Sequence, residues 1–187
     1  MEDEGLLELA KKGDEEAFRQ LYERYVGKIF HYVYLQVGDY HLAEELTQEV
    51  FLKMARGLPG FRREARFQTW LFTIGRNVVT DELRRNKARL RASRVSDQPL
   101  DQIPTEVNAD THPEGKLMAQ TRRTALSLGL KQLSEEQRSV LYFRYEAGYS
   151  LEETSRMMKR SVSAIKSLQW RAVNKLKQVI ERGEVIE

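Results

Sequence analysis

Residues 150–177 read Ser150-Leu-Glu-Glu-Thr-Ser-Arg-Met-Met-Lys-Arg-Ser161-Val-Ser-Ala-Ile-Lys166-Ser-Leu-Gln-Trp170-Arg171-Ala-Val-Asn-Lys175-Leu-Lys177, and this stretch decides the fold. It predicts two short helices, from Ser150 to Lys159 and from Ser161 to the end of the chain, around a tight break. The second helix has one apolar and one basic face. Such a helix fits the major groove of DNA when a partner helix crosses behind it. DNA binding is therefore the first hypothesis.

The second of these helices divides its side chains between two faces. The apolar stripe, expected to be buried, contains Val162, Ile165, Leu168, Ala172 and Leu176. The outward face contains Ser163, Lys166, Ser167, Trp170, Arg171 and Asn174. Small residues at the helix start (Ser161, Ser163, Ala164) would let the backbone approach bases, and the cations can reach guanine edges or phosphates. The basic face can also be merely solvated, and Trp170 can pack on a neighbour, but the capped preceding helix favours DNA contact.

Charge is segregated along the 187 residues, although the net charge is only +3. Residues 1–53 hold twelve acidic and six basic side chains, whereas residues 84–94 hold six basic side chains and no acidic one. A second basic zone runs from Arg156 to Lys177. Each phosphate that a protein neutralises releases counterions and adds affinity. Two separate basic zones therefore predict two separate contacts with a polyanion.

The composition argues against several classes of protein. The chain has no cysteine, which rules out disulfides and thiolate metal sites, and no apolar run long enough to cross a bilayer. Its amino terminus is acidic where a secretion signal would be basic, so we expect a cytoplasmic protein without membrane insertion. The histidines His31, His41 and His112 lack metal-ligand spacing, and the adjacent acids Glu44 and Glu45 diverge on a helix. We therefore expect no catalytic residues, no metal and no cofactor.

The first half of the chain predicts consecutive helices. Apolar residues recur at helical spacing from Leu6 to Tyr25, with a break at Gly13-Asp14 where Asp14 would cap the next helix. Further helices are expected from about Val26 to Gln36 and from about Tyr40 to Ala55. A last one begins at Thr69-Trp70 and continues into the arginine-rich segment.

Residues 95–115 differ from both halves. They contain three of the four prolines, five acids and neither lysine nor arginine, which predicts a flexible acidic linker. The linker is either a plain tether or an acidic segment that occupies a basic channel before nucleic acid arrives. Helices follow from about Glu114 to Gln132, Ser134 to Ala147, Ser150 to Lys159 and Ser161 onward, and capping boxes begin at Ser134 and Ser150. We predict an all-α fold with two small helical domains, residues 1–94 and 116–187.

Three motifs follow one another along the chain. They are Asp39-Tyr-His-Leu-Ala-Glu-Glu-Leu-Thr-Gln-Glu-Val-Phe-Leu-Lys53, then Phe67-Gln-Thr-Trp-Leu-Phe-Thr-Ile-Gly-Arg-Asn77 with Asp81-Glu-Leu-Arg-Arg85, then the terminal helix-turn-helix. In this order they resemble the extracytoplasmic-function (ECF) group of bacterial sigma factors, in the sigma-70 family, over nearly the full length. The resemblance implies a protein that binds RNA polymerase core and gives it promoter choice. The first domain would be the sigma-2 region and the second the sigma-4 region.

The resemblance also implies a surface for RNA polymerase core, with contacts to the β′ clamp helices and the β flap. The helix from Tyr40 would dock on the clamp helices through Glu44, Glu45, Gln48, Glu49 and Leu52. Acids, an amide and an exposed leucine form the mixed kind of patch that transient interfaces use. Without the family likeness, an ordinary solvated acidic face would be the simpler interpretation.

For the minus-10 element, the resemblance points to the segment around the fourth helix. The residues implied are Arg62, Arg63, Arg66, Phe67, Arg76, Asn77, Thr80, Asp81, Arg84 and Arg85. Melting requires a base to leave the stack, which is offset by a pocket for the base and cations for the single strand. We place the base pocket in the loop from about Gly60 to Gln68, and Trp70 and Phe72 in the core.

For the minus-35 element, the resemblance points to the terminal helix-turn-helix. The residues implied are Arg144, Arg160, Ser163, Ala164, Lys166, Ser167, Trp170 and Arg171. The chain has Ser163, Leu168 and Trp170 where many members carry a glycine, an arginine and a smaller ring. We expect Leu168 to turn inward, and the identity of the minus-35 bases does not follow from these residues.

Two further points concern partners. The family likeness implies an anti-sigma factor that keeps the two domains from polymerase, although no residue identifies it. A conventional helix-turn-helix regulator is the alternative function, because it explains the last third of the chain. It leaves the acidic helix and the arginine-rich loop without a task, and no dimer-forming stripe is evident.

Overall fold

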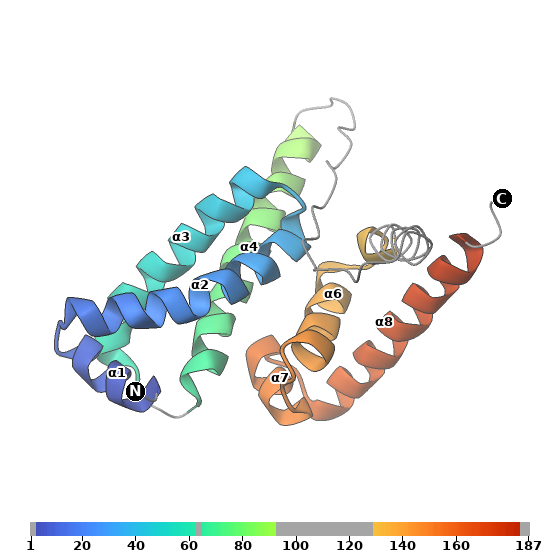
Figure 1. Ribbon diagram of the computed structural model, residues 1–187. Coiled ribbons are helices and arrows are strands. Elements are labelled where there is room, and N and C mark those ends of the chain that lie inside the picture. The colour runs from blue at the N-terminus through green and yellow to red at the C-terminus, as the bar shows by residue number, and fades with distance from the viewer. Residues whose placement is uncertain (1–2, 63–64, 93–128, 184–187) are drawn as a thin grey trace, which may run out of the picture. The chain divides into compact units, whose positions relative to one another are not determined.

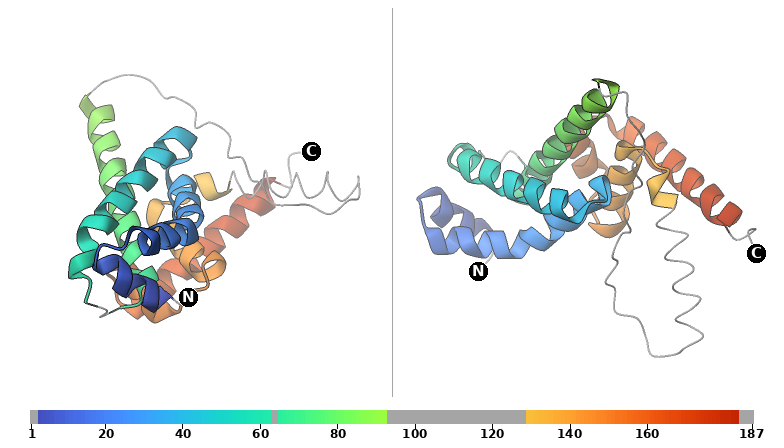
Figure 2. Two further views of the ribbon diagram at one scale, coloured as in Figure 1. Left: turned by 60° about the vertical axis from the view of Figure 1, so that its left-hand side comes forward. Right: turned by 90° about the horizontal axis from the view of Figure 1, so that it is seen from above.

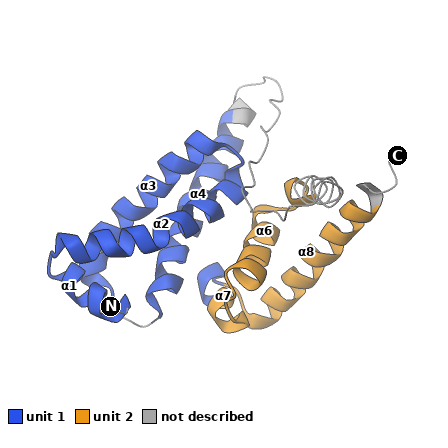
Figure 3. Cartoon of the chain, in the orientation of Figure 1, with its two compact units in different colours: residues 1–101, 156–159 blue, residues 102–155, 160–187 orange. Residues whose placement is uncertain are grey.

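The computed structural model describes residues 3–62, 65–92 and 129–183. Within these ranges the regular elements are all helical, which confirms the predicted all-α fold. The chain divides into two compact units, residues 1–101 with 156–159 and residues 102–155 with 160–187 (Figure 3). The predicted linker and most of the helix expected from Glu114 to Gln132 lie outside the described residues. The predicted domain bounds therefore stay a prediction.

The first unit contains α1 (Asp3–Lys11), α2 (Glu15–Val37), α3 (Tyr40–Gly57), the 3-10 turn η1 (Leu58–Gly60) and α4 (Phe67–Ala92) (Figure 1). Helices α2, α3 and α4 pack against one another, and α1 packs against α2 (Figure 2). Their shared core contains the fully buried side chains of Ile29, Val50, Met54, Leu71 and Val78. This packing fixes the outer faces of α3 and α4, where the predicted contacts lie.

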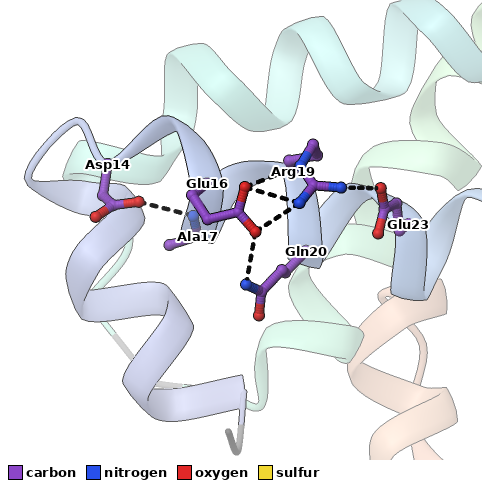
Figure 4. Close-up of polar contacts among 6 residues, drawn as sticks. All are labelled: Asp14, Glu16, Ala17, Arg19, Gln20 and Glu23. Atoms are coloured by element: carbon purple, nitrogen blue, oxygen red, sulfur yellow. Dashed lines mark hydrogen bonds and ion pairs between the residues drawn. The ribbon is translucent and has the colours of Figure 1, made fainter.

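The start of α2 follows the capping prediction. The carboxylate of Asp14 accepts a hydrogen bond from the amide of Ala17 at 2.8 Å (Figure 4). On the exposed face of the next turns, Arg19 binds the carboxylates of Glu16 and Glu23, each at 2.6 Å. The hydrogen bonds from Arg19 and Gln20 lower the pKa of Glu16. The cap and this charge network both stabilise the first turns of the helix.

The prediction of a separate helix beginning near Val26 is wrong, because α2 is continuous from Glu15 to Val37. Buried side chains continue along one face through Leu21, Tyr25 and Ile29, across the glycine at position 27. Their burial offsets the cost of about 1 kcal/mol that a glycine imposes on a helix interior. The helix ends at Gly38, whose φ of 73° is left-handed and whose amide donates to the carbonyl of Tyr34.

The second unit contains α6 (Glu135–Leu141), η2 (Tyr142–Glu146), the first part of α7 (Leu151–Met158), up to Ser155, and α8 (Val162–Gly183). Both predicted capping boxes are confirmed. The hydroxyl of Ser134 accepts from the amide of Gln137, whose side chain accepts from the amide of Ser134. Ser150 and Glu153 make the same reciprocal pair at 3.1 and 2.9 Å.

The α-helix predicted from Ser134 to Ala147 is correct only in its first half. After Leu141 the chain forms a π-helical turn, in which the amide of Ala147 donates to the carbonyl of Tyr142 at 2.9 Å. The wider turn accompanies the complete burial of Phe143, and Gly148 with a φ of 70° then reverses the chain. π turns of this kind are frequent at functional sites.

Candidate nucleic-acid interface

The helix-turn-helix consists of α7, a three-residue turn and α8. Lys159 adopts a left-handed φ of 51°, and the amide of Arg160 donates to the carbonyl of Ser155 at 3.0 Å. The hydroxyl of Ser161 then accepts from the amide of Ala164 at 3.2 Å, which caps the start of α8. The turn is therefore fixed by local hydrogen bonds at both of its ends.

The faces of α8 agree with the sequence pattern. Ile165, Leu168 and Ala172 are buried, so Leu168 lies inward as predicted, while Val162 and Leu176 are half-buried. Trp170 is 69% exposed, which answers the open question about its packing. An indole with this exposure is available to a partner.

The predicted minus-35 residues on α8 lie mostly on one exposed surface. Ser163, Lys166, Ser167 and Arg171 are exposed together with Trp170, whereas Ala164 and the neighbouring Asn174 are half-buried. The Nε of Arg171 donates to the carbonyl of Ser167 at 3.3 Å, one turn earlier on the same helix. We call the side chains of Lys166, Ser167, Trp170 and Arg171 the α8 surface. It offers two cations, a hydroxyl and an aromatic ring along two helical turns.

Arg144 and Arg160, the other two cations of the predicted minus-35 set, bind groups of the protein itself. Arg144, half-buried on η2, donates to the carbonyl of Tyr149 and to the side chain of Gln169 at 3.3 Å. Gln169 in turn donates to the hydroxyl of Tyr145 at 2.9 Å. Arg160 pairs with Glu136. Sequence reasoning missed the link from Arg144 to Gln169, because the two residues are 25 positions apart and no periodic pattern connects them.

In the first unit, the predicted minus-10 residues divide between a loop and α4. Arg62 and Arg66 are exposed, and Arg63 lies outside the described residues. Phe67 is only 5% exposed, and its ring centre lies 5.4 Å from that of Tyr25 and 6.1 Å from that of Phe61. The ring of Phe67 therefore packs in the protein interior against Tyr25 and Phe61.

Phe72 lies in the core as predicted, whereas Trp70, also predicted to be a core residue, lies at its edge. Phe72 is buried, and Trp70 is half-buried with its ring centre 4.9 Å from that of Phe61. A side chain at Gly57 would come within 3.0 Å of the Trp70 ring, so the indole packs directly on that glycine.

The outer face of α4 presents the rest of the minus-10 set. Asn77, Asp81, Arg84 and Arg85 are exposed, while Arg76 and Thr80 are half-buried. Arg84 lies 3.9 Å from Asp81, and Arg85 lies 3.1 Å from Glu82, which is itself buried. The cations of α4 therefore stand beside carboxylates of the same helix.

Helix α3 separates an inner and an outer face as the sequence predicts. Leu46 and Val50 are buried, while the predicted core-binding residues lie outward: Glu44, Glu45, Gln48 and Leu52 are exposed and Glu49 is half-buried. Leu52 is 58% exposed, and Glu49 pairs with Lys53 at 2.8 Å. We call these five outward residues the α3 surface. An exposed leucine among acids is a composition suited to a protein interface.

Among the described residues, no group of three or more histidines and acids is arranged to hold a metal ion. A search of the same residues found no helix long and apolar enough to span a membrane. What the described chain does offer is a helix-turn-helix with an outward basic helix, and a second helical unit with an arginine-bearing helix. These features define the class of helical DNA-binding proteins.

Comparison with known proteins narrows that class. The family model for Sigma-70 region 2 matches residues 21–89, and the model for Sigma-70 region 4 matches residues 129–178. The sigma factor BldN of Streptomyces coelicolor is 34% identical over 176 residues, which cover 94% of this chain and 64% of BldN. SigW of Bacillus subtilis is 26% identical, with 84% of this chain and 85% of SigW covered.

A solved structure has the same fold. It is the sigma factor RpoE in complex with the anti-sigma factor NepR from Bartonella quintana, with a TM-score of 0.70 and 22% sequence identity, covering 91% of this chain and 98% of that one. The chain belongs to the extracytoplasmic-function group of the sigma-70 family, whose members are promoter-directing initiation factors of RNA polymerase.

Proposed function

We propose that this chain binds RNA polymerase core through the α3 surface and then reads two promoter elements, minus-35 with α8 and minus-10 with the loop before α4 and α4 itself. The observation that carries the proposal is the combination of the α3 surface, with its exposed Leu52, and the exposed basic α8 surface in one chain. The alternative function, a conventional helix-turn-helix regulator, does not explain the α3 surface.

The core contact rests on the chemistry of α3. Burying the exposed side chain of Leu52 in an apolar pocket of a partner would lower the free energy of the complex. The acids Glu44, Glu45 and Glu49 favour a basic partner surface. The β′ clamp helices are the proposed partner of this surface, and the β flap that of the second unit.

The minus-35 contact rests on the α8 surface. Lys166 and Arg171 lie one turn or more apart on the exposed side of a helix whose start is capped and whose opposite side is buried. Arginine can bind a guanine edge with two hydrogen bonds, and Trp170 can meet a thymine methyl or a sugar. Arg144 and Arg160 are proposed to approach phosphates while keeping their protein partners.

The minus-10 contact and melting rest on the exposed arginines of the loop and of α4. Arg62 and Arg66 lie within the loop, and Asn77, Arg84 and Arg85 follow along α4. We propose that the loop from Gly60 to Gln68 takes a base that has left the stack, and that the arginines hold the single strand. We further propose an anti-sigma factor as a regulatory partner, because RpoE and NepR form such a complex.

Reconstitution tests the proposed function. The protein is mixed with RNA polymerase core and a library of promoters, and the transcripts are sequenced. We expect initiation from a subset of promoters that share two conserved blocks, and poor duplex binding by the protein alone, because the two DNA-binding surfaces lie on separate units. Tight, specific duplex binding by the isolated protein, without stoichiometric copurification with core, would instead favour the regulator.

A charged substitution separates core binding from DNA binding. Leu52→Asp should weaken core binding at least tenfold, since it removes the apolar anchor and adds a further acid. Leu9→Asp is the matched control, because Leu9 is another partly exposed leucine of the same unit. Equal core affinity for both variants would remove the α3 surface from the proposal.

A further inference from the structure

Helix α1 lies outside the residues that the Sigma-70 region 2 model matches, yet it is linked to both ends of the segment between η1 and α4, directly at Phe61 and through Tyr25 of α2 at Gln68. At the first end, the ammonium of Lys11 donates to the carbonyl of Phe61 at 2.5 Å and lies 5.5 Å from the centre of the Phe61 ring. One cation of α1 therefore holds both the backbone and the side chain of the residue that begins the segment.

At the other end of the segment, Tyr25 links α1 to Gln68. The buried hydroxyl of Tyr25 donates to the carboxylate of Asp3 on α1 and accepts from the side-chain amide of Gln68 at 2.9 Å. Burial, together with the hydrogen bond to Asp3, raises the pKa of Tyr25, so the hydroxyl remains protonated in neutral solution. Arg24 also binds Asp3, which holds this carboxylate in place.

The side chains between these two tethers form one wall. The ring centres of Phe61, Phe67 and Trp70 lie within 6.1 Å of one another. The ring of Tyr25 packs edge-on against that of Phe67, 5.4 Å from its centre. A pocket opens between this wall and the first turns of α1, lined by Leu7, Phe61, Phe67 and Gln68 among others. The tethers therefore fix the wall of the pocket relative to α1.

We infer that α1 sets the base selectivity of the loop, with Lys11 and Tyr25 as positioning residues that do not themselves touch DNA. The inference rests on the proposed function, in which residues 60–68 take the unstacked minus-10 base. The tethers hold Phe61 and Gln68, and with them the lining of the pocket, in one arrangement, whereas release of one tether would let these side chains sample several arrangements and discriminate less between bases. The effect is on selectivity, because neither tether belongs to the α3 surface or the α8 surface.

The test uses the holoenzyme assembled from RNA polymerase core and the full chain. Forked DNA probes carry each of the four bases in turn at every unpaired minus-10 position, and the ratio of the best base to the next is measured. Lys11→Met and Tyr25→Phe should each lower this ratio about fivefold to tenfold, the effect of one hydrogen bond at a partly buried site. Lys11→Arg should restore it.

Matched controls separate positioning from folding. Lys12→Met removes the exposed neighbouring cation, and Tyr22→Phe removes a hydroxyl from a partly exposed ring of the same helix as Tyr25. Both should keep the wild-type ratio. Core affinity and the minus-35 preference, which both require a folded protein, should stay unchanged in all five variants.

Two results would overturn the inference in distinguishable ways. If the wild-type holoenzyme selects a minus-10 base and Lys11→Met and Tyr25→Phe keep that selectivity, or lose it together with the minus-35 preference, α1 has no positioning role. If the wild-type holoenzyme selects no base at any unpaired position, the proposed role of the loop fails and the inference fails with it.

Discussion

Helices α4 and α8 both carry the arginines expected to meet DNA, but they hold them differently. On α4, Arg84 and Arg85 stand beside Asp81 and Glu82, at 3.9 and 3.1 Å. On α8, Arg171 donates to a backbone carbonyl of its own helix, and the helix carries a single acid, Glu181, near its end. Arg171 thus has no acid near it on its own helix, whereas Arg84 and Arg85 are partly neutralised by carboxylates of α4. Within the proposed function, we therefore expect Arg171 to contribute more to DNA binding than Arg84 or Arg85.

The largest expected effect is on the α8 surface. Arg171→Ala should weaken minus-35 recognition by about 1–3 kcal/mol, the usual value of one base contact. Arg84→Ala should weaken minus-10 recognition by no more than about 1 kcal/mol, because Asp81 already offsets part of the charge of Arg84. Transcription from promoters with single substitutions in each element measures both. Lys177→Ala, on α8 beside Glu181, is the matched control. Equal losses from Arg171→Ala and Arg84→Ala would remove the distinction between the two helices.

The two units also differ in how they hold a buried threonine hydroxyl. Thr154 of α7 is fully buried and donates its hydroxyl hydrogen to the carbonyl of Ser150 at 2.8 Å. Thr47 of α3 is 4% exposed, and its hydroxyl has no hydrogen-bond partner within the described part of the chain. Thr47→Val should therefore stabilise the protein by about 1 kcal/mol, and Thr154→Val should destabilise it by about 0.5–1 kcal/mol. Urea unfolding of both variants measures the difference, and a loss of stability in Thr47→Val would show that its hydroxyl is satisfied after all.

What the sequence could predict follows from how local each signal is. The caps at Asp14, Ser134 and Ser150 depend on residues three positions apart, so a pattern was sufficient to find them. The continuity of α2 and the π turn of η2 depend on burial against other helices, which the pattern does not contain.

The candidate site shows the same limit. The inward place of Leu168 follows from helical periodicity, and the structure confirms it. The exposure of Trp170 and the burial of Phe67 are set by neighbours far apart in the chain, as is the link from Arg144 to Gln169. Only the fold brings these neighbours together, so periodicity left Trp170 undecided, and the family resemblance gave no information on how far Phe67 is buried.

A smaller effect is expected at the turn that ends α2 in the first unit. Gly38 has a φ of 73°, a conformation that costs other residues about 1–2 kcal/mol. Gly38→Ala should therefore lower the free energy of unfolding by about 1 kcal/mol, and Gly27→Ala is the control, because position 27 is helical and open space surrounds it. We expect Gly27→Ala to raise stability slightly. Guanidinium unfolding followed by circular dichroism compares the two, and equal stabilities would mean that the left-handed cap is not strained.

The smallest effect is expected at the corresponding turn of the helix-turn-helix, where the left-handed position is filled by a lysine. Lys159 has a φ of 51°, so Lys159→Gly should relieve strain, but the added glycine also enlarges the entropy of the unfolded chain. Together these two effects should raise the free energy of unfolding of Lys159→Gly by about 0.5 kcal/mol, a smaller change than the loss expected for Gly38→Ala. Lys166 keeps the α8 surface basic in this variant, so a thermal shift without a change in minus-35 preference is the expected readout. A weaker minus-35 preference would instead assign Lys159 to the DNA-binding surface and extend that surface from α8 into the turn.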